Sequence, residues 1–291
     1  MRTVEAISHG AITIVNAMAT GRGAALGVRL WTKARVTLTD NPGQVQARIL
    51  SEPGEDPSLI RITAMTVLGK FAAQHYGAIV ETESNIPIAV GLKSSSAASN
   101  AVAAATLAAL SRRTSALETV RLGVLSSLKA GVTLTGAFDD ACACYFGGLI
   151  VTNNRICKIL KQYRPSSHRI RVLLHVPLTK KYSGDVRQSS FRSIKRFVDL
   201  AHQEALKRNY LLSLTLNGIA YSGIFDYDMS SVTDALHAGA LAAGLSGKGP
   251  AIAAIVPDRK IEHVISAWKS YPGRIIETTF NLEKASAQVW T

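Results

Sequence analysis

Residues 87–101 constrain this chain more than any other segment, because three consecutive serines stand there between a glycine and an alanine-rich run. The preceding residues, 78–84, have the composition of a β-strand, and residues 97–110 contain no helix breaker. Glycine lets a backbone approach an anion closely, and the free N–H groups at a helix N-terminus attract negative charge. The segment therefore predicts an anion-binding loop that opens a buried helix.

Two other interpretations of this segment are weaker. A loop that only enters a buried helix needs one capping serine, whereas this loop has three serines. The common P-loop pattern G-x-x-x-x-G-K-[ST] does not occur in this segment or elsewhere in the chain. Residues 247–249 look similar, but Gly249 stands where a P-loop has serine or threonine. Lys93 is a candidate point charge toward a phosphate, although a solvated loop lysine is an equally good interpretation.

The composition is that of a folded chain of enzyme size. With 291 residues, of which 47% are hydrophobic and 18% charged, it is long enough for two domains and is not a disordered chain. The longest apolar run, 97–110, is too short to span a bilayer, and the N-terminus has no secretory pattern. We therefore expect a cytoplasmic protein without a membrane partner. The net charge of +13 suits an anionic substrate, and since no aromatic-interleaved basic motif is present, we expect no nucleic-acid partner.

The residue patterns mix strands and helices, which predicts an α+β fold. Before residue 161 we expect strands at 3–9, 12–17, 24–30, 35–38, 45–49, 78–84, 148–152 and 156–160, with helices at 59–76, 96–111 and 116–130. After residue 168 we expect strands at 169–176, 251–256 and 274–280, with helices at 185–207, 209–221, 231–243 and 261–271. The composition change across 161–168 predicts a boundary between a domain of residues 1–164 and one of residues 165–291.

The anion-binding segment is similar to the nucleotide-binding signature of the GHMP kinase superfamily, whose usual form is Gly-Leu-Gly-Ser-Ser-Ala. Two further blocks, at 10–27 and 245–251, resemble the same superfamily and lie in the same order along the chain. Lys93 and the additional serine resemble its archaeal shikimate kinase branch. The resemblance implies the α+β, two-domain GHMP kinase fold with the active site in the inter-domain cleft.

The resemblance also implies a reaction and its cofactors. It implies ATP-dependent phosphorylation of the 3-hydroxyl of shikimate with Mg²⁺, so that the partners are small molecules, shikimate and ATP. A homoserine or mevalonate kinase of the same superfamily is the alternative, and a basic nucleic-acid-binding protein that shares the fold is a third hypothesis. The third predicts an aromatic or basic stripe, which the sequence does not contain.

The resemblance assigns the nucleotide and the metal to the anion-binding segment. Ser96 matches the serine that binds Mg²⁺ in the superfamily, and the additional serine leaves Ser95 open for the same role. The glutamate that supplies a second ligand in related enzymes has no match, because Lys129 stands at that position. The implied nucleotide-binding residues are Pro87, Ile88, Ala89, Val90, Gly91, Leu92, Lys93, Ser94, Ser95, Ser96 and Ala97.

Two adjacent aspartates, Asp139 and Asp140, lie among apolar residues, where an unpaired carboxylate would be costly. Either aspartate could cap the helix that follows. In the superfamily a base aspartate precedes a Gly-Gly pair by a fixed interval, and Asp140 matches that position ahead of Gly147 and Gly148. The resemblance therefore implies Asp140 as the catalytic base, Lys93 as the second catalytic residue, and Asp139 in a capping or metal-binding role.

The N-terminal block and the last block contain the candidates for acceptor binding. The N-terminal block lacks carboxylates, which suits an acceptor that is itself a carboxylate, and Arg22 could pair with such a group. The glycines of the last block would let backbone N–H groups approach a substrate, although a bare turn has the same composition. The candidate substrate-binding residues are Thr13, Asn16, Arg22, Ser246, Gly247 and Gly249.

Overall fold

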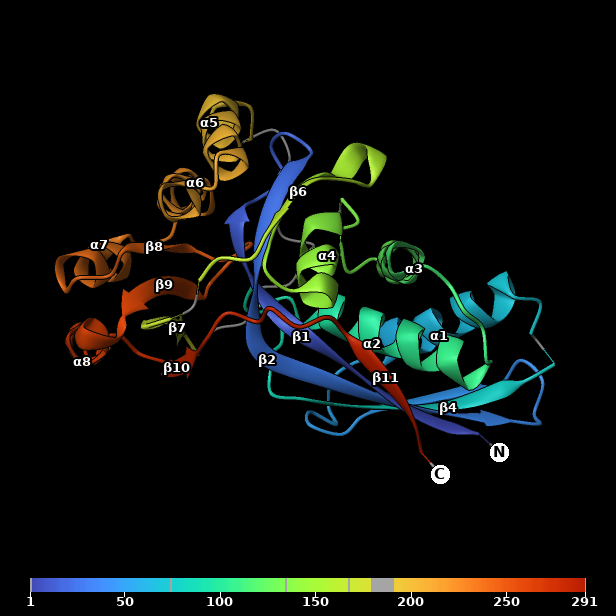
Figure 1. The fold of residues 1–291 in the computed structure, drawn as a ribbon. Helices are drawn as coiled ribbons and strands as arrows, with labels where there is room; N and C mark the ends of the chain where they lie inside the picture. The colour runs from blue at the N-terminus through green and yellow to red at the C-terminus, as the bar shows by residue number, and fades with distance from the viewer. Residues whose placement is uncertain (1, 74, 134, 167, 179–190, 291) are drawn as a thin grey trace.

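The computed structural model describes residues 2–73, 75–133, 135–166, 168–178 and 191–290, which form two sheets with helices packed against them (Figure 1). The larger, seven-stranded sheet consists of β1 (Thr3–Val15), β2 (Arg22–Thr39), β3 (Val45–Ile49), β4 (Gly77–Ser84), β5 (Leu149–Asn153), β6 (Lys158–Tyr163) and β11 (Ser286–Trp290). The smaller, four-stranded sheet consists of β7 (Ile170–Val176), β8 (Ala242–Leu245), β9 (Ile252–Pro257) and β10 (Arg274–Thr278). The expected α+β class is confirmed.

Helices α1 (Ser58–Lys70), α2 (Ser94–Ala109), α3 (Ala116–Lys129) and α4 (Phe138–Phe146) accompany the larger sheet. Helices α5 (Lys195–Leu206), α6 (Tyr210–Phe225), α7 (Ser230–His237) and α8 (Ile261–Trp268) follow in the second half. Helix α2 contacts β1, β2 and the other three helices of the first group, so it forms the centre of that layer (Figure 1). None of the helices in the described part of the chain combines the length and apolar character needed to cross a bilayer.

The two long strands β1 and β2 connect the two halves of the molecule. Side chains of residues 3–9 in β1 alternate between buried and half-buried, as expected of a strand covered on one face, whereas residues 10–15 are all buried. Helices α4, α5 and α6 all contact β1, and Asn217 of α6 bonds to Asn16 directly after the end of the strand. The end of β1 is therefore enclosed by elements from both halves of the sequence, and residues placed there can contact both.

Several strands and helices differ from the sequence-based expectation. The expected pairs of short strands are single strands, β1 and β2, because the chain passes Gly10 through a register shift after His9 instead of ending the strand. Helix α1 ends at Lys70 instead of residue 76, and the left-handed Ala72 (φ 50°) explains the early stop. The expected helix at 231–243 ends at His237, and β8 follows it. The early part of the helix expected at 185–207 lies outside the described residues.

Strand β11 was not expected from the sequence. It pairs antiparallel with β1, with Thr3 opposite Trp290 and Ile7 opposite Ser286, so the two ends of the chain lie side by side (Figure 1). The larger sheet thus combines residues 3–163 with residues 286–290. The domain boundary between residues 164 and 165 stays a prediction.

We expect a chain that ends at Ala285 to be less stable than the full chain, because β1 would lose its pairing with β11 and become an edge strand. Each lost ladder hydrogen bond contributes ~1 kcal/mol, so the free energy of unfolding should fall by roughly 2–4 kcal/mol, with increased self-association. Chemical denaturation and light scattering measure the two effects. Val289→Ser changes an exposed side chain without removing the strand and serves as the control; equal stability of the truncated and full chains would contradict the prediction.

Candidate active site

A cavity of about 520 Å³ lies at the N-terminus of α2 and brings together the three sequence blocks. The predicted site residues that line it are Thr13, Asn16, Ile88, Ala89, Gly91, Lys93, Ser94, Ser95, Ser96, Asp139, Asp140, Gly247 and Gly249. Those that do not line it are Arg22, Pro87, Val90, Leu92, Ala97 and Ser246. Val90, Leu92 and Ala97 are buried in the hydrophobic core instead, where they anchor the anion-binding loop.

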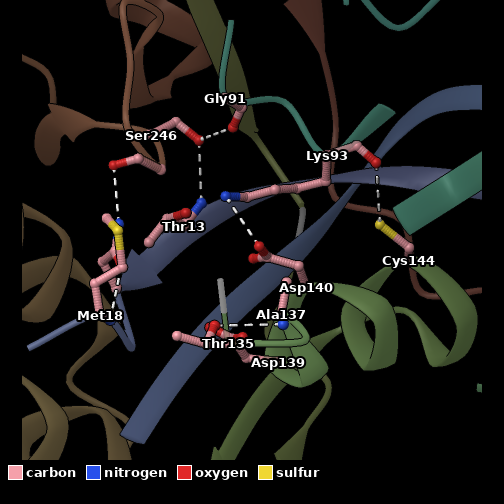
Figure 2. Close-up of polar contacts among 12 residues, drawn as sticks. Thr13, Met18, Gly91, Lys93, Thr135, Ala137, Asp139, Asp140, Cys144 and Ser246 are labelled. Carbon is pink, nitrogen blue, oxygen red and sulfur yellow. Dashed lines mark hydrogen bonds and ion pairs between the residues drawn. The ribbon is translucent and has the colours of Figure 1, made fainter. Parts of the chain in front are cut away.

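The anion-binding loop is shaped by left-handed residues. Ala89, Gly91 and Lys93 have φ values of 59°, 88° and 68°, so every second residue turns the backbone sharply. A Cβ atom at Gly91 would collide with the carbonyl oxygen of Ser246, and the Ser246 hydroxyl donates a hydrogen bond to the Gly91 carbonyl at 2.8 Å (Figure 2). Glycine is therefore required here because the loop after β8 approaches the backbone closely.

The first turn of α2 faces the cavity with free N–H groups. The helix begins at Ser94, so the serines lie within its first turn, and its N-cap is Lys93, whose side chain makes no capping bond. The Ala97 N–H bonds to the Lys93 carbonyl, which leaves the N–H groups of residues 94–96 without an intrahelical acceptor. All three serines line the cavity, so this helix end can bind an anion such as a phosphate.

Lys93 and Asp140 form an ion pair inside the cavity. The Lys93 Nζ lies 3.2 Å from Asp140 Oδ2, and both side chains are largely buried (Figure 2). Burial raises the pKa of the Asp140 carboxyl, while the charges of Lys93 and of Lys248, which also lines the cavity, act in the opposite direction. Asp140 Oδ1 is buried without a hydrogen-bond partner among the described residues. This oxygen is therefore free to accept a proton or a ligand.

Asp139 has a different environment. Asn154 Nδ2 donates to Asp139 Oδ1 at 2.7 Å, and Thr152 Oγ1 donates to Asn154 Oδ1 at 2.6 Å. A Cβ atom at Gly23 would collide with Asp139 Oδ2, so that glycine makes room for the carboxyl group. Burial, and then the charge of Asp140, raises the pKa of Asp139 to about 7. Asp139 is therefore a structural carboxyl that is easily protonated.

The alternative that an aspartate caps α4 does not hold. The N-cap is Ala137, and both aspartates lie in the first turn of the helix. There the positive end of the helix dipole favours a carboxylate, and the pair faces the cavity from α4. Neither Asn154 nor Thr152 was identified from the sequence, because no local pattern indicates that they approach Asp139.

We divide the lining of the cavity into two ends according to the elements that supply its residues. One end is lined by the apolar Ile49, Leu59 and Ile60 together with Ser51, around the ends of β3 and β4, where Ile49 is paired with Thr82. Asp140 and Thr13 belong to the other end, which includes residues 16–18 and 247–249. Thr13 Oγ1 is buried without a hydrogen-bond partner among the described residues, so it is available to a bound molecule.

Asn16 and Ser246 make hydrogen bonds within the protein and Arg22 lies outside the cavity lining, so their roles in acceptor binding stay predictions. Asn16 uses its side-chain amide internally, since Nδ2 donates to the Gly247 carbonyl and Oδ1 accepts from the Met18 N–H. Ser246 joins backbone segments through its hydroxyl. Arg22 is exposed and lies outside the cavity lining, because neighbouring strand residues face opposite sides and Gly23 is the one that faces Asp139.

Lys129, at the position of the missing glutamate, lies on α3 and contacts the Thr66 hydroxyl at 3.5 Å. It is not part of the cavity lining. Among the described residues, no cluster of three or more histidine, cysteine, aspartate or glutamate side chains forms a ready-made metal site.

Comparison with known proteins identifies the family to which this chain is related. Residues 59–148 match the family model of the GHMP kinases N terminal domain, and residues 192–273 match that of the GHMP kinases C terminal domain. The chain is 41% identical over 278 residues to a protein named shikimate kinase from Methanosarcina mazei, covering 95% of this chain and 94% of the relative. It is 40% identical over 270 residues to a protein of the same name from Pyrococcus furiosus, covering 92% and 96%.

Solved structures show the same fold at low sequence identity. Methanococcus jannaschii mevalonate kinase has a TM-score of 0.78 at 14% identity, covering 95% of this chain and 98% of that one. Homoserine kinase from Cytophaga hutchinsonii has a TM-score of 0.74 at 15% identity, covering 98% and 97%. The chain belongs to the GHMP kinase family, and its fold is the two-domain fold of that family. It is an ATP-dependent small-molecule kinase, as the three sequence blocks predicted.

Gly91→Ala should weaken both the fold and ATP binding, because the new methyl group collides with the Ser246 carbonyl. Gly43→Ala is the matched control: Gly43 is also left-handed (φ 70°), but nothing lies within 4 Å of the position that its new methyl group would occupy. Both variants share the backbone strain of about 1 kcal/mol, so the difference between them isolates the collision. Thermal melting and the Michaelis constant for ATP measure it, and equal behaviour of the two variants would show that the close approach is unimportant.

The raised pKa of Asp139 predicts a pH-dependent stability. Between the ordinary value of 3.8 and about 7, the folded protein keeps a proton that the unfolded chain releases, so this stabilisation is lost as the pH rises through 7. Relative to Asp139→Asn, the wild type should lose at least ~1 kcal/mol of unfolding free energy between pH 4.5 and 7.5. Asp228 is the control, because hydrogen bonds from Ser230 lower its pKa and it is ionised in both the folded and the unfolded chain above pH 4.5, so Asp228→Asn should show no such pH-dependent difference. Denaturation across this pH range measures both.

Proposed function

We propose that this protein transfers the γ-phosphoryl group of ATP to the 3-hydroxyl of shikimate. The observation that carries the proposal is the Lys93–Asp140 pair beside the free N-terminus of α2, because one cavity then holds a phosphate site and a candidate base. The choice of acceptor is supported by relatives that are named shikimate kinase and align with more than nine-tenths of the chain. The homoserine and mevalonate kinase structures support the fold alone.

The triphosphate of ATP would lie against residues 94–96. Backbone N–H groups and the helix dipole there stabilise negative charge without rearranging during the reaction. Lys93 adds a positive charge that lies next to the proposed base. The apolar end of the cavity around Ile49 and Leu59 suits a flat nucleobase, because it offers apolar surface with the polar edge of Ser51.

The acceptor would lie at the end of the cavity that contains Thr13 and Asp140. In the reaction, the acceptor oxygen forms a bond to the γ-phosphorus, the bond from that phosphorus to the ADP oxygen breaks, and the acceptor proton passes to Asp140. Lys93 favours the ionised form of Asp140. Asp139 is the carboxyl that tolerates protonation, so the two neighbours need not both be charged at once.

Mg²⁺ fits the oxygen atoms that the cavity offers. Mg²⁺ binds through one or two protein oxygens together with water and substrate phosphates, and the cavity presents the Ser96 hydroxyl at the N-terminus of α2. We propose Ser96 as its protein ligand, with Ser95 as the alternative. When bound, the ion would neutralise charge on the β- and γ-phosphates. An enzyme of this kind works where ATP is supplied, so we place it in the cytoplasm.

A coupled ADP-release assay with shikimate, homoserine, mevalonate and galactose tests the proposal directly. Shikimate should give the highest kcat/KM of the four acceptors. If another acceptor gives a higher kcat/KM, that acceptor is the substrate and the proposal is wrong. The assay requires only the purified full-length chain with ATP and Mg²⁺.

Asp140→Asn should lower turnover with shikimate by roughly 10²-fold or more without lowering the melting temperature, because it keeps the shape but removes the base. Asp139→Asn is the matched control on the neighbouring residue and should cost far less activity, since Asn154 can still donate to the new amide oxygen. A folded Asp140→Asn enzyme with near-normal turnover would rule out the base role and leave positioning by the α2 N-terminus as the main catalytic device.

A further inference from the structure

The turn between β1 and β2 forms a wall of the acceptor end but is held by a distant helix. Asn16, Ala17 and Met18 of this turn line the cavity. The contacts that fix the turn come from α6, which lies about two hundred residues further along the chain. The sequence blocks that resemble the family do not include α6.

Two side chains of α6 bond to the backbone of the turn. Asn217 Oδ1 accepts a hydrogen bond from the Asn16 N–H at 2.7 Å. The Tyr221 hydroxyl donates to the Asn16 carbonyl at 3.1 Å and accepts from the Ala19 N–H at 2.9 Å. Residues four apart lie on one face of a helix, so both side chains reach the same turn. Three backbone groups of the turn therefore depend on two residues.

These bonds lie in the protein interior. Asn217 and Tyr221 are both 0% exposed, so water cannot replace a lost partner. Burial raises the pKa of Tyr221 well above its ordinary value, so the phenol keeps its proton and remains a donor. Its ring packs against Phe191 and Phe225, which fixes the direction of the hydroxyl.

Helix α6 is itself fixed to the element that forms the opposite wall. A Cβ atom at Gly218 would lie 2.5 Å from the Gly244 Cα, so the helix and β8 meet backbone to backbone. Strand β8 ends at Leu245, directly before the loop of residues 246–249, whose last three residues line the cavity. Asn16 Nδ2 donates to the Gly247 carbonyl and so links the turn directly to this loop. Both walls are thus set by one helix.

We propose that Tyr221 and Asn217 are positioning residues for the acceptor: they hold the turn of residues 16–20 at the distance from the 246–249 loop that the acceptor requires. This inference rests on the proposed function. Neither side chain lines the cavity, so both act through the backbone of the turn. Loosening the turn should affect the acceptor end, whereas the ATP end, built on α2 and β3, keeps its own supports.

Tyr221→Phe removes both hydroxyl bonds and keeps the ring. We expect about a tenfold rise in KM for shikimate, with KM for ATP changed less than about twofold, because the turn that loses these bonds lines the acceptor end of the cavity. Tyr163→Phe is the matched control, because it also removes a tyrosine bond to a backbone carbonyl, at 2.6 Å, but that carbonyl belongs to Leu206, which does not line the cavity as Asn16 does. It should lower the melting temperature without changing either KM. Asn217→Ala should also raise KM for shikimate, and it replaces Tyr221→Phe in the test if Tyr221→Phe folds poorly.

Hydrogen–deuterium exchange separates this inference from the proposed function. In Tyr221→Phe without substrate, the amide of Ala19 should exchange faster than in the wild type, while amides of α2 are unchanged. If shikimate is not a substrate of the wild type, the proposed function fails, and the exchange result still decides the positioning role. Unchanged exchange of the turn, or equal changes in both KM values, would overturn the inference.

Discussion

The close contact between the loop after β8 and the loop before α2 is the interaction on which the site depends. The Ser246 hydroxyl donates to the Gly91 carbonyl and accepts from the Thr13 N–H at 3.2 Å, and the Ala251 N–H donates to the Val90 carbonyl at 3.1 Å. These bonds connect the two sheets at the level of the cavity. A side chain at position 91 would push the two loops apart, because its Cβ atom would collide with the Ser246 carbonyl. The phosphate site and the acceptor wall are therefore positioned relative to each other by backbone packing.

The second constraint is the burial of two neighbouring carboxyl groups. Two buried negative charges side by side would be strongly unfavourable, so each needs its own compensation. Asp140 is compensated by the ammonium of Lys93, and Asp139 by the amide of Asn154 and by ready protonation. The pair thus divides into one carboxyl with an open oxygen in the cavity and one that is held in place. This division provides the physical basis for the contrast expected between their asparagine variants.

Much of the secondary structure could be predicted from local patterns, and the exceptions have tertiary causes. Helices α2 and α3 lie close to their expected ranges, because apolar content and helix breakers are local properties. The alanines of β8 favour a helix in the sequence pattern, but this segment forms a strand that packs against α6 through Gly218 and Gly244. Strand β11 has no strong local signal and is defined by its pairing with β1. Charge suggests Arg22 as an acceptor ligand, while in the structure it is exposed and lies outside the cavity lining.

By itself, the sequence determined that a helix begins at the serine run, that its N-terminus is suited to an anion, and which kinase family the chain resembles, because glycine, serine and paired aspartates carry their chemistry in short segments. Only the tertiary structure decided how these segments meet. It placed Lys93 against Asp140, set Asn154 against Asp139, and made Asn16 and Ser246 connecting residues in the walls of the site. Tyr221 and Asn217 could not be identified beforehand, because their hydrogen-bond partners lie about two hundred residues away and a local sequence pattern contains no information on such distant contacts.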